Sequence, residues 1–200
     1  MPQTSRRVFL GLMAGVVLAT PAVIAPTSNV SAQGTGAFPE LSDGGLVVYF
    51  RHGATTWSGI DRLEWPREQQ RLLSEEGIRQ SELIGEAFAK RGIPVGEVLA
   101  SPFARCRDMA EIAFGRVEER MELVGLLSDD GGREERIAYL SRRVTEAPGP
   151  GLNRIIVSHT SNIAAVANVR LKEGEAVVIQ PDGAKGFTIL GTAMPDDWLR

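Results

Sequence analysis

The sequence predicts a three-layer α/β/α domain in which helices cover both faces of a mostly parallel sheet. Two observations carry this expectation. Short apolar runs alternate along the chain with longer stretches in which apolar residues recur at helical spacing. The short runs, such as "LVVYF" and "RIIVS", are nearly continuous in apolar residues, which is typical of strands that are buried on both faces.

The first 32 residues are predicted to be a twin-arginine-type export signal. Arg6 and Arg7 precede an apolar stretch at residues 8–25, and residues 30–32 ("VSA") fit a cleavage site. A retained membrane anchor is the alternative, although Pro21 disfavours a stable membrane span. We therefore expect a cleaved signal, no stable span after cleavage, and a periplasmic or secreted protein.

Residues 33–44 are expected to form a linker, and residues 45–200 a single domain of ordinary size. All 25 acidic residues and 20 of the 22 basic residues follow residue 32, which makes the formal charge of this part near −5. Because no run of basic residues occurs either, nucleic acid is not an expected partner. With one cysteine, Cys106, an exported monomer has no internal disulfide.

The first predicted strand and helix follow the linker. Residues 46–50 are apolar throughout and follow two glycines, so they predict a buried central strand. A helix is expected at 74–91, with Ser74 as its N-cap and acidic residues in its first turn. Its apolar stripe consists of Ile78, Leu83, Ile84, Ala87 and Phe88.

The second predicted strand, residues 98–100, leads into another helix. Ser101 is its expected N-cap, Pro102 its first residue and Gly115 its stop signal. Arg105 then falls within the first turn or so of this helix.

The rest of the chain continues the alternation. We expect a weaker strand at 118–124, a charged helix at 132–147, and strands at 154–158 and 176–179. The charged helix carries Ile137, Leu140 and Val144 on one side, and prolines end it.

Both histidines of the chain directly follow the ends of predicted buried strands. His52 follows Arg51 and the strand at 46–50, and His159 follows the strand at 154–158. Because ligands of open α/β sheets bind at the carboxyl ends of the strands, these side chains and Arg105 are expected to share one site. Guanidinium groups bind phosphoryl oxygens, and a neutral imidazole can attack phosphorus. The grouping therefore predicts a phosphoryl-transfer site.

Four motifs resemble the ordered motifs of the histidine phosphatase superfamily, the phosphoglycerate mutase-like proteins. They are "RHG" at residues 51–53, "LLSEEGIRQSELIG", "SPFARCRDMA" and "VSHTSNI". The resemblance implies a phosphoglycerate mutase-like fold and a nucleophilic His52 that becomes phosphorylated. It also implies that Arg51, Arg105 and His159 form the phosphate pocket. No cofactor is expected, and no metal, because the chain has only two histidines and one cysteine.

The general acid that would protonate the leaving group is not evident. The mutase-like branch implies a glutamate some 25 residues after Arg105, where this chain has Asp129 and Asp130. Glu173 and Glu175 are further candidates, of which Glu175 is slightly favoured. We therefore keep Glu175 and Asp130 as possible acids. If none acts, good leaving groups are favoured, as in phosphohistidine, phosphoramidates or activated esters.

The function expected from these residues is that of an exported phosphatase. It would hydrolyse a phosphomonoester or phosphoramidate of a small molecule or surface glycolipid through a phosphohistidine intermediate. A periplasmic phosphoanion-binding protein without turnover is the alternative. The long connection at 54–71 is expected to lie over the same site, where Trp57, Trp65 and its arginines either contact the substrate or only hold the loop. The oligomeric state is left open.

Overall fold

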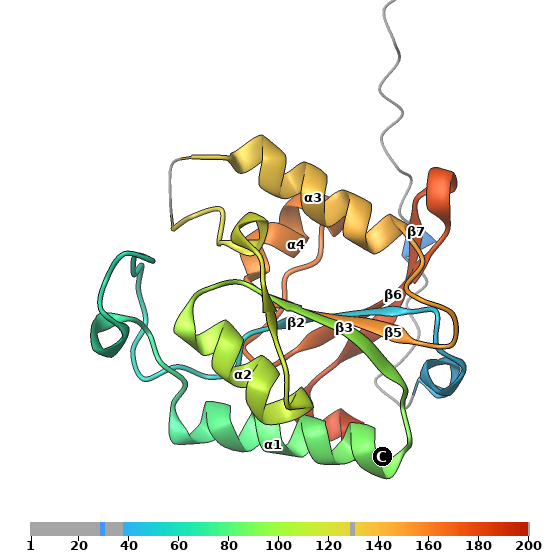
Figure 1. Cartoon of the computed structure of the whole chain (residues 1–200), viewed down its shortest axis with the longest axis horizontal. Helices are drawn as coiled ribbons and strands as arrows, with labels where there is room; N and C mark the ends of the chain where they lie inside the picture. The colour runs from blue at the N-terminus through green and yellow to red at the C-terminus, as the bar shows by residue number, and fades with distance from the viewer. Residues whose placement is uncertain (1–28, 31–37, 129–130, 200) are drawn as a thin grey trace, which may run out of the picture.

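The computed structural model of the protein describes residues 29–30, 38–128 and 131–199 (Figure 1). Apart from residues 29–30, the predicted export signal lies outside the described residues. Among the described helices, none combines the length and the apolarity that a membrane crossing requires.

A seven-stranded sheet in the order β1-β7-β6-β2-β5-β3-β4 forms the centre of the fold. The strands are β1 (Asn29–Val30), β2 (Val47–Arg51), β3 (Val95–Ala100), β4 (Glu118–Glu119), β5 (Asn153–Ser158), β6 (Ala176–Pro181) and β7 (Phe187–Ala193). Only β6 runs against the others, because it pairs antiparallel with both β2 and β7. The predicted mostly parallel sheet is confirmed, with β2 as a central strand.

Two helices cover each face of the sheet, which confirms the predicted three layers (Figure 1). Helices α1 (Glu75–Lys90) and α2 (Ala104–Phe114) pack on one face, and α3 (Arg133–Thr145) and α4 (Thr160–Ala167) on the other. Strand β2 contributes to both cores. Val48 and Phe50 face α1 and α2, while Val47 and Tyr49 face α3 and α4.

Helix α1 begins as predicted, because Ser74 accepts a hydrogen bond from the backbone N–H of Gly77. Its buried face differs in one position from the predicted stripe. Ile78 is 40% exposed, whereas Ile84, Ala87 and Phe88 are buried. Ile78 instead lines a shallow groove with residues of α2, among them Asp108 and Ile112.

Helix α2 begins later than predicted. Its first residue is Ala104 and its N-cap is Phe103, so Ser101 and Pro102 precede the helix. Ser101 does not cap it, because its buried hydroxyl contacts His159 instead. Gly115 ends the helix with a positive φ of 69°, as expected of a left-handed C-cap.

The segment after α2 was expected to be one strand and is two short elements. Only Glu118–Glu119 pairs with the sheet, and Met121–Leu123 forms a 3₁₀ helix that turns Leu123 into the core. In α3, Leu140 and Val144 are buried, while Ile137 is only partly so.

The predicted linker contributes to the domain core in its described part. Pro39–Asp43 forms a 3₁₀ helix, Phe38 and Leu41 are buried, and the ring of Phe38 lies 6.0 Å from that of Trp198. The packed domain therefore includes residues upstream of Gly45.

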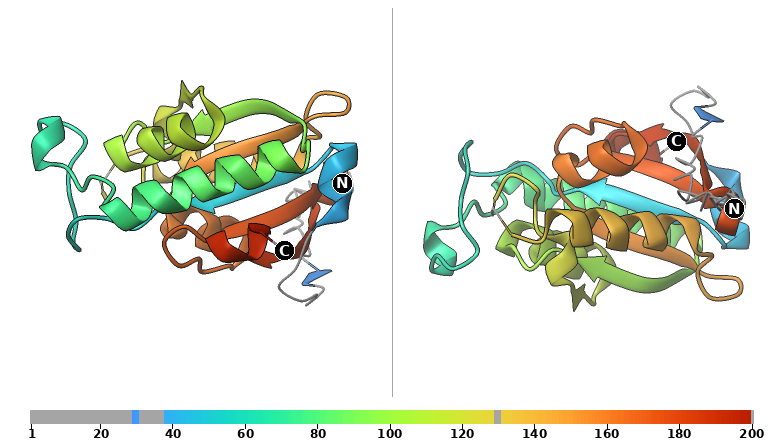
Figure 2. Two further views of the ribbon diagram at one scale, coloured as in Figure 1. Left: turned by 90° about the horizontal axis from the view of Figure 1, so that it is seen from below. Right: turned by 90° about the horizontal axis from the view of Figure 1, so that it is seen from above.

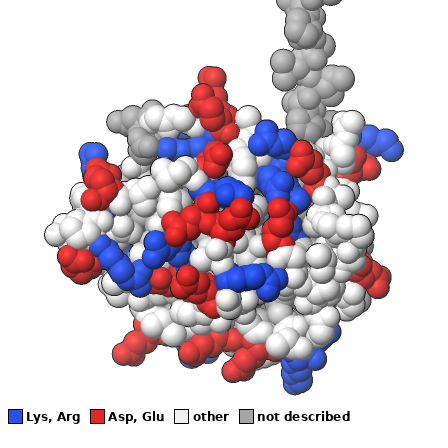
Figure 3. All heavy atoms as spheres, in the orientation of Figure 1, with Lys and Arg blue, Asp and Glu red and all other residues white. Residues whose placement is uncertain are grey.

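The carboxyl end of β2 carries the long connection to α1, which extends from one end of the molecule (Figures 1 and 2, teal). Strands β2 and β5 are adjacent and parallel, with Arg51 paired to Ser158. The residues that follow these two strands therefore lie side by side. On the face seen in Figure 3, acidic and basic side chains are intermixed.

Candidate active site

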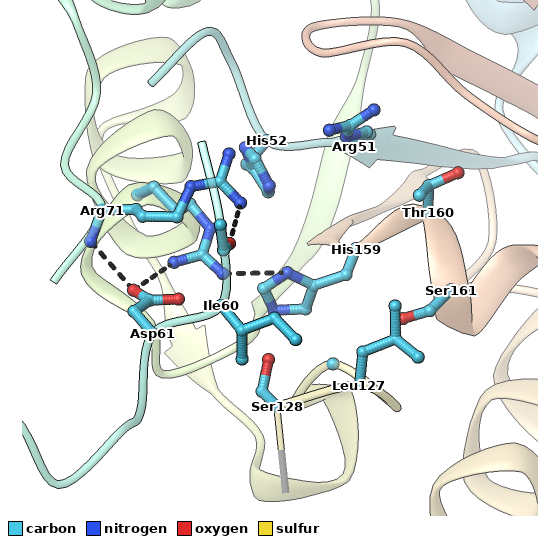
Figure 4. Close-up of a pocket in the computed structure, with 13 residues that line it drawn as sticks. Arg51, His52, Ile60, Asp61, Arg71, Leu127, Ser128, His159, Thr160 and Ser161 are labelled. Atoms are coloured by element: carbon cyan, nitrogen blue, oxygen red, sulfur yellow. Dashed lines mark hydrogen bonds and ion pairs between the residues drawn. The ribbon is translucent and has the colours of Figure 1, made fainter. Parts of the chain in front are cut away.

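A pocket of about 150 Å³ lies at the carboxyl ends of β2 and β5 (Figure 4). Its polar and charged lining includes both histidines, three arginines and one carboxylate. The lining residues are Arg51, His52, Gly59, Ile60, Asp61, Arg71, Arg105, Gly125, Leu127, Ser128, His159, Thr160 and Ser161. The structure thus brings together the four side chains that the sequence placed in one site.

His52 is oriented for nucleophilic attack. Its Nδ1 lies 2.9 Å from the carbonyl oxygen of Gly53, so Nδ1 carries the proton and donates it. The other ring nitrogen, Nε2, then holds a free lone pair. Burial, followed by the charge of Arg105, lowers the pKa of His52 well below 6.5. The imidazole is therefore neutral at physiological pH, as a nucleophile must be.

Helix α1 holds the residues after His52 in place through a close backbone approach. A Cβ on Gly77 would lie 2.1 Å from the carbonyl oxygen of Ala54, and a Cβ on Gly53 would lie 3.0 Å from that of Gly77. Only glycine permits this spacing. The N-terminal turn of α1 therefore packs directly on the segment that orients the His52 ring.

His159 is also neutral, and its tautomer is opposite to that of His52. Its Nδ1 lies 3.4 Å from Nη2 of Arg105, which can only donate, so Nδ1 accepts. Its Nε2 then donates to the hydroxyl of Ser101 at 3.0 Å. Burial, followed by Arg105, lowers the pKa of His159 well below 6.5. Without a bound anion, the ring of His159 is therefore uncharged. It does not add a positive charge to the pocket.

The two histidines are close enough to share one phosphoryl group, because their ring centroids are 5.6 Å apart. The hydroxyl of Tyr49 donates to the carbonyl oxygen of His159 at 2.8 Å and so holds the backbone directly after β5.

Arg105 is the buried cation of the pocket. Its Nη1 donates to Oδ2 of Asp61 at 2.8 Å, and both side chains are almost fully buried. Its Nε is buried and has no hydrogen-bond partner among the described residues. The guanidinium of Arg105 also lines the pocket, and its positive charge favours an anionic ligand there.

Arg71 lies in the long connection and joins the site. Its Nε donates to the carbonyl oxygen of Trp57 at 2.9 Å, and its Nη1 to that of Gly59 at 3.1 Å. Its Nη2 contacts Thr55 and Glu173. Burial, followed by the charge of Arg105, lowers the pKa of Arg71. Arg71 therefore orders the loop and adds a third positive charge to the pocket.

Asp61 and the full role of Arg71 are what the sequence reasoning missed. Arg71 was only one of several loop arginines with a possible substrate contact, and Asp61 was not singled out. Loop positions carry no periodicity, so no local signal distinguishes Arg71 from Arg62 and Arg67. Those two pair with Glu64 and Asp108, and neither lines the pocket.

Arg51 lines the edge of the pocket and is tied to the segment before β6. Its Nη1 donates to the carbonyl oxygen of Leu171 at 3.0 Å, and its Nη2 to Glu173 at 3.2 Å. Glu173 therefore bridges Arg51 and Arg71. Because three arginines and Asp61 line the pocket, its lining carries a positive charge excess that suits a phosphoryl dianion.

The two candidate general acids are not part of the described pocket lining. The Oε2 of Glu175 accepts from the backbone N–H of Lys172 at 2.8 Å, and this side chain does not line the pocket. Asp130 lies outside the described residues. Among the described lining residues Asp61 is the one carboxylate, and it is ion-paired with Arg105.

The tryptophans of the long connection are partly buried and participate in holding it. Trp57 is 39% exposed and lies under the guanidinium of Arg71, 6.0 Å from its ring centroid. The carbonyl oxygen of Trp65 accepts from Gln70. Within the described residues, no three His, Cys, Asp or Glu side chains are grouped as metal ligands.

Chemically, the site can bind and attack a phosphoryl group. The peripheral oxygens can accept from the arginines, while Nε2 of His52 approaches phosphorus. His52 lines this pocket and is only 2% exposed.

Comparisons with known proteins agree with this geometry. The family model of the histidine phosphatase superfamily (branch 1) matches residues 47–148, which include His52 and Arg105 but not His159. A metal-independent phosphoserine phosphatase of Arabidopsis thaliana is 29% identical over an alignment of 154 residues, which covers 68% of this chain. The chain matches 63% of the length of that relative.

Solved structures share the fold at low sequence identity. The protein histidine phosphatase SixA in complex with tungstate has a TM-score of 0.58 at 18% identity, over 78% of this chain and 99% of that one. The alpha-ribazole phosphatase of Shigella flexneri has a TM-score of 0.53 at 18% identity, over 72% and 94%. These likenesses confirm a phosphoglycerate mutase-like α/β fold.

Proposed function

This chain belongs to the histidine phosphatase superfamily, and from that premise we propose that it is a phosphatase that works through a phosphohistidine on His52. The substrate would be a phosphomonoester or a phosphoramidate. The observation that carries the proposal is the state of His52, which is neutral, has its tautomer set by Gly53, and lies in one pocket with three arginines.

The proposed reaction has two steps. Nε2 of His52 attacks phosphorus in line with the leaving group, so an N–P bond forms as the P–O or P–N bond breaks. Water then attacks the phosphohistidine, which releases phosphate and regenerates the imidazole. The arginines stabilise the charge that is spread over the peripheral oxygens in both steps.

Protonation of the leaving group limits the choice of substrate. The described pocket holds no carboxyl group other than Asp61, which pairs with Arg105. We therefore propose that leaving groups needing little proton donation are favoured, such as phosphoramidates and activated esters. A phosphorylated small molecule or a surface glycolipid fits this reaction. The names of similar proteins support both phosphomonoesters and phosphoramidates as substrates, since one is a phosphoserine phosphatase and another a protein histidine phosphatase.

We also propose that the protein is exported through the twin-arginine route and acts in the periplasm or outside the cell. Arg6, Arg7 and the apolar stretch at 8–25 support this. Replacing both arginines with lysines should leave precursor in the cytoplasm, and unchanged export would contradict the route.

Trapping the intermediate tests the central proposal. Enzyme incubated with a ³²P-labelled phosphomonoester and quenched rapidly in base should retain an acid-labile label. Because the chain has two histidines, His52→Asn and His159→Asn form a matched pair. Only His52→Asn should abolish the label completely. Label that survives in His52→Asn would refute the assignment. Phosphate binding without any hydrolysis of p-nitrophenyl phosphate would instead favour the phosphoanion-binding alternative.

A further inference from the structure

The mouth of the pocket is apolar, unlike its floor. Ile60 and Leu127 both line the pocket, yet they are 64% and 71% exposed. They come from different segments, the long connection after β2 and the loop before α3, and both lie beside His159 in Figure 4. Both side chains line the same pocket, so a ligand that reaches its mouth would contact them.

The geometry of in-line attack determines which part of the substrate lies at the mouth of the pocket. The leaving group departs on the side of phosphorus opposite the attacking nitrogen. His52 lines the pocket and is only 2% exposed, so the leaving group points toward the opening. The part of the substrate beyond the bridging atom is therefore the part that meets Ile60 and Leu127.

The described hydroxyl groups of the lining are those of Ser128, Thr160 and Ser161. The hydroxyl of Thr160 accepts from the backbone N–H of Leu171, and that of Ser161 accepts from Leu126 and donates to Asn162. The charged residues in the described part of the lining are the three arginines and Asp61, which pairs with Arg105. Among the described lining residues, no carboxylate is left to recognise an ammonium group on the substrate.

We propose that Ile60 and Leu127 form a leaving-group subsite and that the substrate carries an apolar alkyl or aryl group next to its phosphoryl group. This inference rests on the proposed function, because it takes the phosphoryl group to lie on the arginines with His52 beneath it. It adds that the protein recognises the leaving group of the substrate as well as its phosphoryl group. The apolar area of the leaving group is removed from water when both side chains cover it.

Phosphonates test the subsite without any turnover, because their P–C bond is not hydrolysed. Dissociation constants for methylphosphonate, hexylphosphonate and 2-aminoethylphosphonate can be measured by calorimetry on the full domain. Hexylphosphonate should bind about tenfold more tightly than methylphosphonate, less than complete burial of its chain would give, because the mouth is open. 2-Aminoethylphosphonate should gain nothing over methylphosphonate.

Variants of Ile60 and Leu127 test whether these side chains cause the tighter binding of hexylphosphonate. Ile60→Asn and Leu127→Asn should each reduce the ratio of the methylphosphonate to the hexylphosphonate dissociation constant, and the double variant should bring it close to one. Leu199→Asn is the matched control, because Leu199 is 60% exposed and does not line the pocket, so it should keep the wild-type ratio. These side chains are mostly in solvent, so the substitutions leave the core intact.

The outcomes separate this inference from the proposed function. Binding of methylphosphonate without a gain for hexylphosphonate would overturn the apolar subsite alone, as would a preference for 2-aminoethylphosphonate. A ratio that persists in the double variant would also overturn it. No binding of any phosphonate would refute the phosphoryl pocket and, with it, this inference.

Discussion

The guanidinium of Arg105 donates to the carboxylate of Asp61 across 2.8 Å, and both side chains are almost completely buried beside His159. Asp61 also accepts from the backbone N–H of Arg71. The carboxylate of Asp61 thus links α2, which carries Arg105, to the long connection, which carries Arg71. Both residues line the pocket.

Asp61→Asn should therefore destabilise the protein by about 3 kcal/mol in phosphate-free buffer, because it leaves a buried guanidinium without its counter-ion. Urea unfolding measures this. Inorganic phosphate should restore more stability to this variant than to the wild type, since a bound anion replaces the missing charge. Asp108→Asn, which breaks the exposed pair with Arg67, should cost less than about 1 kcal/mol. Equal losses in the two variants would contradict the prediction.

Arg71→Lys keeps the positive charge but loses the donors that hold the long connection. We expect kcat/KM for p-nitrophenyl phosphate to fall by about two orders of magnitude, as when a preorganised donor is removed from an active site. Backbone amides at residues 57–61 should also exchange with deuterium faster. Arg67→Lys, in the same loop but outside the pocket, is the control. Unchanged exchange in Arg71→Lys would show that its guanidinium does not order the loop.

The two buried neutral histidines predict a loss of stability on mild acidification. The pKa of each lies well below 6.5 in the folded protein, so below 6.5 the unfolded chain binds protons that the folded protein does not. Their contribution is present above 6.5 and decreases as the pH falls, by up to about 1.4 kcal/mol per pH unit for each histidine. Urea unfolding between pH 7 and about 5.5, above most carboxylate titration, measures the slope.

The control for this pH dependence is the variant with both histidines replaced by asparagine. It should lose most of the slope over the same range, since asparagine does not titrate. A slope as steep as that of the wild type would assign the protons to other groups.

Gly77→Ala should impair catalysis through the backbone. Its Cβ would meet the carbonyl oxygen of Ala54 at 2.1 Å and displace the segment that accepts from His52. Gly85→Ala is a matched control in the same helix, with a Cβ 2.5 Å from the carbonyl oxygen of Ala113, far along the chain from the site. Each should cost about 1–3 kcal/mol of stability. Only Gly77→Ala should lower kcat, measured where both variants are folded, and equal kcat values would contradict this role.

The fold class and the shared sheet edge of the two histidines could be predicted from the sequence. Continuous apolar runs identify buried strands, and parallel strands bring their carboxyl ends to one edge, which is where His52 and His159 were expected. That their strands are direct neighbours was shown by the structure. Helix boundaries were less certain. Ser101 looks like an N-cap, but in the folded chain its hydroxyl hydrogen-bonds His159 and the helix starts at Ala104.

The contacts between the side chains of the site could be seen only in the folded protein. The pairing of Asp61 with Arg105, the position of Arg71, the opposite tautomers of the histidines and the unpartnered Nε of Arg105 all depend on distances between segments far apart in sequence. Loop residues such as Asp61 and Ile60 follow no periodic pattern, so nothing local indicates which side chains face a pocket. Burial and neighbouring charge, which set the pKa values of the histidines, exist only once the layers have packed.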